Sequence, residues 1–325
     1  MSGSPAAESA LGEVLYARLA AHARLRHLQL LAAIDACGSI ARAAAQLHIS
    51  QPAATQSLTD LERIVGVRLF DRHARGVRAN AAGRALTAAA RGALGGMRTA
   101  AESLAAITHG ATAALALGTI PAAAQALVAD LLAAFCAAHP GVHVELHEDS
   151  GQRLLPMLGA GTLDAVFCRA PDPLPAGCRF EPLLDDGVVV VAGSHHPLAQ
   201  RRGLRLEDLQ AARWVLPVAR TQLREVFEAL VLARQPDARW FPVATTSLPV
   251  LQGLLQQPGA ASLMPRSLSA AMCASGRVCR LDLALDAPLR PLGVAYDAAD
   301  APALMQGLLA VARRGRPAAP GFSGA

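Results

Sequence analysis

The sequence predicts an α/β protein that begins with a separate all-α domain, and three features of the chain lead to this prediction. Apolar residues between 25 and 65 recur at helical spacing, with breaks at small polar residues and glycine. Residues 81–108 contain no proline and are rich in alanine, which favours one long helix. From residue 113 onward, short β-branched runs alternate with helical segments, as in parallel sheets covered by helices.

The length of 325 residues is enough for two or three domains. The extension at the N-terminus has no clear pattern, and disorder is one interpretation of it. We divide the chain into an N-terminal extension (1–22), a helical domain (23–80), a linker helix (81–109), an α/β domain (110–316) and a C-terminal tail (317–325).

The composition favours a cytoplasmic protein without a membrane partner. No run of eighteen or more residues is uninterruptedly apolar, and the first twenty residues lack the basic and apolar regions of a secretion signal. The six cysteines have no CxxC pair and no regular spacing, so we expect reduced thiols rather than a disulfide framework.

The positive charge of the chain lies in its first third. Residues 1–110 hold 12 arginines and 7 acidic side chains, a net charge of +5, whereas residues 111–325 are neutral. Residues 63–91 contain seven arginines and a single acidic residue, Asp71. This bias suggests a polyanionic partner at the N-terminal end, although a solvated charged face accounts for the same pattern.

The helical domain contains two short helices around a tight turn, preceded by a supporting helix. Gly38 follows the first helix at the position of a C-terminal cap, and Ser39 can cap the second. Ser50 can cap a third helix that runs to about Val65, with Pro52 tolerated in its first turn. The pattern is that of a helix-turn-helix.

The outer side of the third helix carries groups that suit contact with bases. With Ala54, Leu58, Leu61 and Ile64 turned inward, the outward residues are Gln51, Pro52, Thr55, Gln56 and Thr59. Gln and Thr can donate to and accept from base edges, and apolar atoms can meet thymine methyl groups. An exposed polar helix without any nucleic-acid role is the alternative.

Residues 25–86 resemble the winged helix-turn-helix of LysR-type transcriptional regulators, most clearly in GSIARAAAQLHISQPAATQSLTDLE (38–62) and GVRLFDRHARGVRANAAG (66–83). The resemblance implies a regulator that binds double-stranded promoter DNA. It also implies that residues at the start of the third helix face the major groove and that Arg75, in the wing, enters a minor groove or holds phosphate. Arg72 either binds phosphate or braces the wing, for example through Glu62. The predicted DNA-binding residues are Ser50, Gln51, Pro52, Thr55, Gln56, Arg72 and Arg75.

The long linker helix carries a heptad seam of small and apolar residues, and Asn80 stands at its start as a capping residue. The seam either packs on the protein's own α/β domain or pairs with a second subunit. The resemblance favours a homodimer, assembled further into a homotetramer. The seam residues are Leu86, Ala90, Ala93, Met97, Ala100, Leu104 and Ile107.

The last two thirds of the chain predict strands and helices in alternation, and the resemblance implies a two-lobed, periplasmic-binding-protein-like effector domain. The run GVVVVAG (187–193) is a candidate for a strand that crosses between lobes. The other strands are expected at 113–119, 143–148, 164–168, 213–216, 241–245, 260–264 and 291–296. The helices are expected at 121–138, 153–158, 221–234, 247–256 and 302–313.

Ligands of open α/β sheets bind beyond the carboxyl ends of the strands, so polar groups at these positions are candidate ligand contacts. Helix N-termini at these turns suit a carboxylate, and Arg169 can add a charged hydrogen bond, which favours an anionic small-molecule effector. Each of these residues can equally be a cap or a turn residue. The predicted effector-binding residues are Thr119, Ser150, Arg169, Thr245, Thr246, Ser247, Met264 and Pro265.

No metal, cofactor or enzymatic activity is expected. His139, His143 and His147 are spaced by four, but Pro140 and Gly141 break the helix that would align them. No nucleophile elbow, phosphate loop or dinucleotide fingerprint occurs, and we interpret Asp185–Asp186 as a solvated turn. The alternative function is a soluble solute-binding or enzymatic α/β domain whose N-terminal helices mediate assembly.

Overall fold

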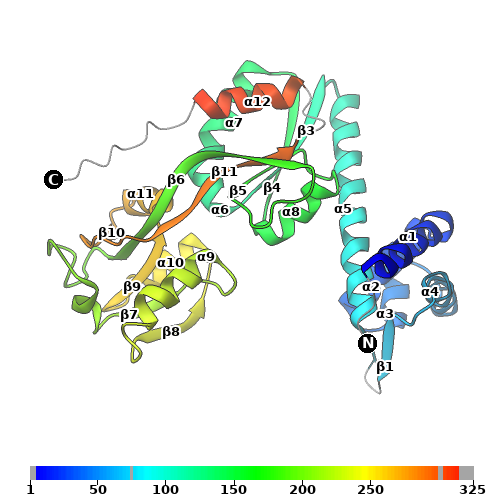
Figure 1. Ribbon diagram of the computed structural model, residues 1–325, viewed down its shortest axis with the longest axis horizontal. Coiled ribbons are helices and arrows are strands. Elements are labelled where there is room, and N and C mark those ends of the chain that lie inside the picture. Colours follow the sequence, from blue (N-terminus) through cyan, green and yellow to red (C-terminus); the bar gives the residue numbers. More distant parts are fainter. Residues whose placement is uncertain (1–4, 74–75, 299–302, 315–325) are drawn as a thin grey trace. The chain divides into compact units, whose positions relative to one another are not determined.

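The computed structural model describes residues 5–73, 76–298 and 303–314. The chain forms two compact units, Met1–Thr108 and His109–Ala325. Figure 1 labels most of their helices and strands.

The N-terminal unit is a winged helix-turn-helix followed by a long helix. Its buried core lies between α2, α3, α4 and the wing, and includes Leu31, Ile34, Leu58 and Leu61. The elements are α1 (Pro5–His22), α2 (Leu25–Cys37), α3 (Ile40–Gln46), α4 (Gln51–Val65), β1 (Phe70–His73), β2 (Gly76–Ala79) and α5 (Ala81–Thr108).

The helix boundaries follow from the predicted caps. Gly38 ends α2 in the left-handed conformation at φ 63°, which glycine adopts without steric cost. The hydroxyl of Ser39 accepts from the Arg42 N–H, and that of Ser50 accepts from the Ala53 N–H. The prediction for α4 was wrong in one detail, since Val65 is buried whereas Ile64 is only half-buried.

The wing is a two-stranded antiparallel ribbon that is fixed to both neighbouring helices. The Glu62 carboxylate on α4 accepts from the Leu69 N–H at 2.8 Å. The Asn80 carboxamide accepts from the Gly83 N–H at 2.9 Å and donates to the Arg68 carbonyl at 2.8 Å, which confirms Asn80 as the cap of α5. A Cβ on Gly83 would lie 1.9 Å from the Leu69 carbonyl oxygen, so only glycine allows this close packing.

The extension that precedes the helix-turn-helix is helical where disorder was one interpretation, because Pro5–His22 forms helix α1. Its sequence is rich in alanine, leucine and glutamate, which are strong helix formers. Leu19 packs against the core of the N-terminal unit, so the helix is fixed at its C-terminal end.

The C-terminal unit is a two-lobed α/β domain. Lobe I holds the parallel strands β3 (Ala113–Thr119), β4 (Val142–Glu148) and β5 (Ala165–Arg169), and lobe II holds the parallel strands β7 (Arg213–Leu216), β8 (Arg239–Ala244) and β9 (Ala260–Pro265). The helices are α6 (Pro121–Ala123), η1 (Ala124–Val128), α7 (Ala129–Ala138), α8 (Gly151–Gly159), η2 (Leu206–Leu209), α9 (Gln222–Phe227), η3 (Glu228–Leu232), α10 (Leu248–Leu254), α11 (Arg266–Ala274) and α12 (Ala303–Arg314).

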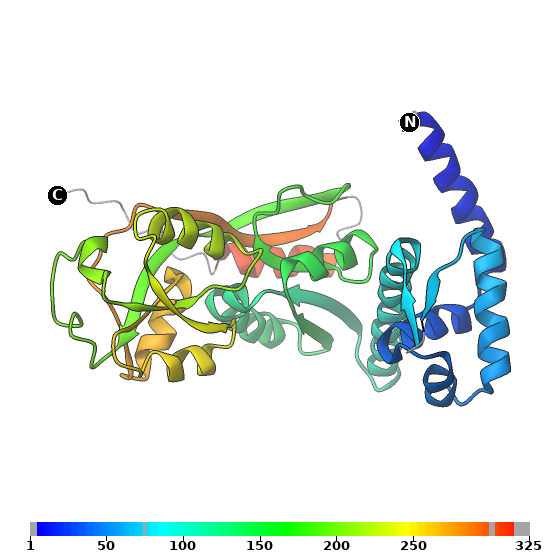
Figure 2. The same ribbon diagram turned by 90° about the horizontal axis from the view of Figure 1, so that it is seen from below.

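Two long strands, β6 (Cys178–Gly193) and β11 (Pro288–Asp297), connect the lobes. They pair with each other in antiparallel fashion, and they are the long green and orange strands of Figure 2. The first half of β6 belongs to the sheet of lobe I, while Val188–Ala192 pairs with β9 of lobe II. The predicted crossing strand is therefore confirmed, but it begins nine residues earlier than its β-branched run.

Several short elements of lobe II were not predicted from the sequence. They are helices η2 and α11 and strand β10 (Val278–Arg280), which pairs with β6. Helix η2 and strand β10 span only four and three residues, which is too few apolar positions to establish a period. The predicted helix at 121–138 is confirmed, with a π-helical turn in its middle.

One helical stretch of the described chain, Pro121–Ala138, has the length and composition of a membrane span. Gln125 and Asp130 interrupt it, so it is not an uninterrupted apolar run in the sequence. Val128, Leu131 and Phe135 are buried in the main core of the C-terminal unit. We therefore assign this stretch as a core helix of lobe I.

Candidate nucleic-acid interface and ligand site

Helix α4 has a buried side and an exposed side, and the predicted base-contacting residues lie on the latter. Ala54, Leu58 and Leu61 are buried. Gln51, Pro52 and Gln56 are exposed and Thr55 is half-buried, so these residues share one face over the first two turns. The structure thus brings the predicted α4 residues together.

The polar groups on this face differ in the hydrogen bonds that they form within the helix. The Thr55 hydroxyl donates to the Gln51 carbonyl at 3.0 Å, and the Ser50 hydroxyl caps the helix. The Gln56 carboxamide donates to the Asp60 carboxylate at 3.0 Å, which aligns Gln56 along the helix. Ser50 therefore has a structural role at the start of α4, whatever else it contacts.

The two predicted wing residues are less well defined. Arg72 lies on β1, but its side chain is outside the described part of the structure, and Arg75 is outside it altogether. Glu62, the suggested partner of Arg72, binds the Leu69 N–H. The roles of Arg72 and Arg75 stay predictions.

Three predicted ligand residues come from neighbouring strand ends of lobe I. Thr119 ends β3, Ser150 follows β4 and Arg169 ends β5. The turns are tied together, because the Ile120 N–H donates to the Phe167 carbonyl and the Asp149 N–H donates to the Thr119 carbonyl. The three residues thus lie along one edge of the sheet, as the strand-end rule predicts.

Their side chains are not equally available for a ligand. Thr119 is fully buried and its hydroxyl donates to the Ile120 carbonyl. Ser150 is exposed at the start of α8, and its backbone N–H donates to the Asp149 carboxylate at 2.6 Å. Only Ser150 of this pair presents its side chain to solvent.

The predicted ligand residues of lobe II also differ in their exposure to solvent. Thr246 and Ser247 are exposed after β8, and the Thr245 hydroxyl accepts from the Ser247 N–H at 3.0 Å, which shapes the turn before α10. Met264 is 2% exposed and packs in the main core, and Pro265 is buried at the start of α11. Of these five residues, Met264 and Pro265 are covered by protein in this conformation.

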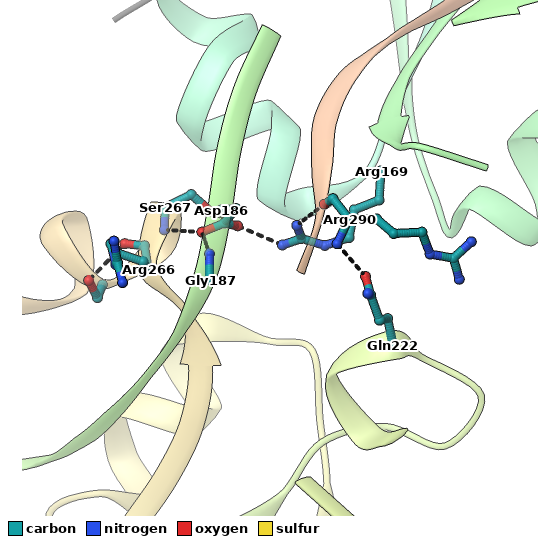
Figure 3. Close-up of polar contacts among 8 residues, drawn as sticks. Arg169, Asp186, Gly187, Gln222, Arg266, Ser267 and Arg290 are labelled. Atoms are coloured by element: carbon teal, nitrogen blue, oxygen red, sulfur yellow. Dashed lines mark hydrogen bonds and ion pairs between the residues drawn. The ribbon is translucent and has the colours of Figure 1, made fainter. Parts of the chain in front are cut away.

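The centre of the domain holds an ion pair that no local sequence signal marked. The Arg169 guanidinium lies 2.7 Å from the Asp186 carboxylate, with the two side chains 16% and 1% exposed. Asp186 also accepts from the Ser267 hydroxyl at 2.7 Å and from the N–H groups of Ser267 and Gly187 (Figure 3). The interpretation of Asp186 as part of a solvated turn was wrong, because β6 extends through it and carries it into the interior.

A second contact joins β11 to lobe II. The Gln222 carboxamide, at the start of α9, accepts from the Arg290 N–H at 3.0 Å, and the Arg290 side chain points away from the Arg169–Asp186 pair in Figure 3. Arg266 and Arg290 are both exposed. Their positive charges are open to solvent, whereas the charge of Arg169 is neutralised by Asp186. Arg290 was not predicted because it precedes the expected strand at 291–296, and Arg266 was not predicted although it lies two residues after the expected strand at 260–264.

The three histidines spaced by four do not align as a set of metal ligands. His147 Nε2 lies 2.8 Å from Glu145 Oε1 on β4. No group of three or more His, Cys, Asp or Glu side chains in the described chain has the arrangement of a metal site.

Comparisons with known proteins agree with this architecture. The model of the LysR substrate binding domain matches residues 108–316, and that of the bacterial regulatory helix-turn-helix protein of the lysR family matches residues 25–84. The regulator GbpR of Azospirillum brasilense is 35% identical over 66% of this chain, and the alignment spans 64% of GbpR. The regulator GalR of Pseudomonas putida is 30% identical over 88% of this chain and 71% of GalR.

Solved structures show the same fold. Full-length CbnR in complex with its target DNA has a TM-score of 0.65 at 22% identity, with 90% of this chain and 99% of that chain covered. A mutant of OxyR from Corynebacterium glutamicum has a TM-score of 0.52 at 27% identity, with 90% and 91% covered. With both family models matched in chain order and the two units folded accordingly, this chain belongs to the LysR family of transcriptional regulators.

Proposed function

We propose that this protein is a cytoplasmic regulator that binds promoter DNA through α4 and responds to a small molecule bound by its C-terminal unit. The observation that carries the proposal is the exposed face of α4, where Gln51, Pro52 and Gln56 stand at the start of the helix. Residues at this end of a recognition helix contact base edges in the major groove. The protein acts in this proposal by binding and not by catalysis.

The second half of α5 supports a homodimer. Its seam residues Met97, Leu104 and Ile107 are 55%, 64% and 47% exposed, whereas Ala90 of the same seam is buried. An equivalent helix from a second subunit can bury apolar residues that are exposed along one helical stripe. A two-fold dimer would present two α4 helices to the half-sites of a pseudo-palindromic promoter, and pairs of dimers would form a homotetramer.

The effector site in this proposal lies at the strand ends where β6 and β11 pass between the lobes. Ser150, Thr246 and Ser247 offer polar groups there, and Arg266 and Arg290 offer positive charge. Arginine forms charge-assisted hydrogen bonds with carboxylates and phosphates, which favours an anionic effector. Regulation requires that the effector bind one arrangement of the subunits more tightly than another.

The test is a gel-shift titration of the purified protein against the intergenic DNA upstream of its own gene, beside a random duplex of equal length. Preference for the upstream DNA supports regulation of a neighbouring promoter. Equal and salt-sensitive binding to both duplexes would indicate a target elsewhere. Failure to bind either duplex at low salt would contradict the proposal and favour a solute-binding role.

A further inference from the structure

A hollow of about 440 Å³ lies in the N-terminal unit, between the extension helix and α4. It is built from α1, the turn into α2 and the second half of α4. Its lining residues are Arg18, His22, Arg24, Arg26, His27, Asp60, Arg63 and Ile64.

The charge of this lining is strongly unbalanced, with four arginines and two histidines beside one carboxylate. That carboxylate, Asp60, is already occupied by the Arg63 guanidinium and the Gln56 carboxamide. Arg18, Arg24 and Arg26 are exposed, and among the side chains that the structure describes no other acidic one lines the hollow. A site with this balance of charge attracts an anion.

One of the two histidines that line the hollow, His27, is buried. His27 is 4% exposed, and its Nδ1 accepts from the Arg24 N–H at 3.1 Å, which fixes the turn between α1 and α2. Burial and the nearby Arg26 and Arg24 cations lower the pKa of His27, although Asp60 opposes them. His27 therefore has a structural role in this turn, and the exposed arginines supply the binding charge.

The position of the hollow on α4 identifies what it would bind. Gln56, Asp60 and Arg63 follow one another at helical spacing, linked by hydrogen bonds along a single side of the helix. The hollow thus begins one turn beyond the face where Gln51 and Gln56 are proposed to read bases. DNA that lies against that face carries its phosphates past the edge of the helix.

We propose that the extension helix α1 completes a phosphate-binding site that holds the DNA backbone beside the base pairs contacted by α4. The proposal rests on the proposed function, since it requires α4 to lie on DNA. Arg18 comes from α1, outside the residues 25–84 that match the family's helix-turn-helix. The contact would thus be an addition by this chain to its helix-turn-helix. Arginine suits it, because its planar guanidinium can bind phosphate in bidentate fashion.

The experiment is a fluorescence-anisotropy titration of the full-length protein with its upstream duplex and with a random duplex, at about 50 to 200 mM salt. The test variant is Arg18→Gln with Arg24→Gln. The matched control is Arg98→Gln with Arg202→Gln, which removes the same charge at two exposed positions that do not line the hollow. Thermal unfolding followed by circular dichroism verifies that every variant is folded.

The expected result is weaker binding of the test variant to both duplexes, with the salt slope reduced by about one for each phosphate that is no longer neutralised. If Arg18 and Arg24 each bind one phosphate, the ratio of wild-type to variant affinity for DNA falls about tenfold between 50 and 200 mM salt. The control variant should keep the wild-type slope.

Two outcomes would overturn this inference while leaving the proposed function intact. In the first, wild-type protein binds DNA and the test variant has the same slope and affinity as the control. In the second, inorganic phosphate raises the melting temperature of wild type but not of the test variant, and DNA binding is unaffected; the hollow then binds a small anion. If wild type binds neither duplex, both proposals fail.

Discussion

The Asp186 carboxylate, carried by β6, lies 2.7 Å from the Arg169 guanidinium at the end of β5, and the Ser267 hydroxyl of α11 donates to the same carboxylate at 2.7 Å. One nearly inaccessible carboxylate therefore connects lobe I to lobe II at the strand that both lobes share. A buried charge with all its partners present is satisfied, but removal of one partner leaves the other uncompensated.

Replacement of Asp186 should destabilise the C-terminal unit strongly. We expect Asp186→Ala to lower the free energy of unfolding by about 3 kcal/mol or more, because Arg169 then stays largely buried without its counter-ion. Urea denaturation followed by circular dichroism measures this change. The control is Asp185→Ala, one residue away and exposed, which should change the stability by less than about 0.5 kcal/mol. Equal effects of the two substitutions would contradict the assignment.

Replacement of Gln51 should relax sequence choice rather than weaken all binding. Gln51→Ala is expected to remove about 1–3 kcal/mol of discrimination between the upstream duplex and random DNA, because glutamine reads base edges and not phosphates. Competition gel shifts with both duplexes measure the ratio of the affinities for the upstream and the random duplex. Gln210→Ala, an exposed glutamine of the other unit, serves as the control. Equal losses on specific and random DNA would show that Gln51 does not read bases.

A charge placed on the exposed seam of α5 should prevent subunit association. Leu104 is 64% exposed in the single chain, so Leu104→Glu changes little within the subunit but buries a carboxylate at the proposed dimer contact. Sedimentation velocity should show a shift toward monomer at micromolar concentration. Ala88→Glu introduces the same charge at an exposed position on the opposite side of the helix and should leave the assembly unchanged.

The N-terminal unit should lose stability in mild acid because of His27. Burial and nearby arginines lower the pKa of His27 in the folded protein, so the unfolded chain binds more protons between that lowered pKa and 6.5. The stability is fully present above pH 6.5 and falls as the pH drops below it. Thermal unfolding over this range measures the effect, which His27→Gln should flatten. His73→Gln, at an exposed position of the same unit, should keep the wild-type pH dependence.

The thiols should differ sharply in reactivity. Burial raises the pKa of Cys168 to about 12, so its thiolate is scarce at pH 8 and no reagent reaches it in the folded protein. Cys136 is exposed. Titration with a disulfide reagent should modify Cys136 rapidly and Cys168 only after unfolding, and Cys136→Ser should abolish the fast phase. Rapid modification of Cys168 in the native protein would contradict its burial.

Much of the fold followed from local sequence signals. The cap at Ser39 and the glycine at Gly38 each act over a few residues, the proline-free run after Asn80 favours helix along its whole length, and the structure confirms all three. The exposed residues of α4 could be predicted for the same reason, because the spacing of its buried residues determines which side faces outward.

The candidate ligand site could be predicted only in part. The rule that ligands lie at strand ends identified Thr119, Ser150 and Arg169, which do lie along one edge of the sheet. It could not indicate that Thr119 is buried or that Arg169 is neutralised, since both depend on which residues of distant segments pack against them.

The sequence by itself determined the order of the domains, the helix-turn-helix with its exposed polar face, and most strands of the α/β domain. These depend on periodicity and caps, which act between residues close together in the chain. Only the tertiary structure decided that Asp186 is a buried partner of Arg169, and that Arg18 of α1 shares a hollow with Arg63 of α4. The physical reason is that burial and electrostatic pairing are set by side chains brought together from distant parts of the chain.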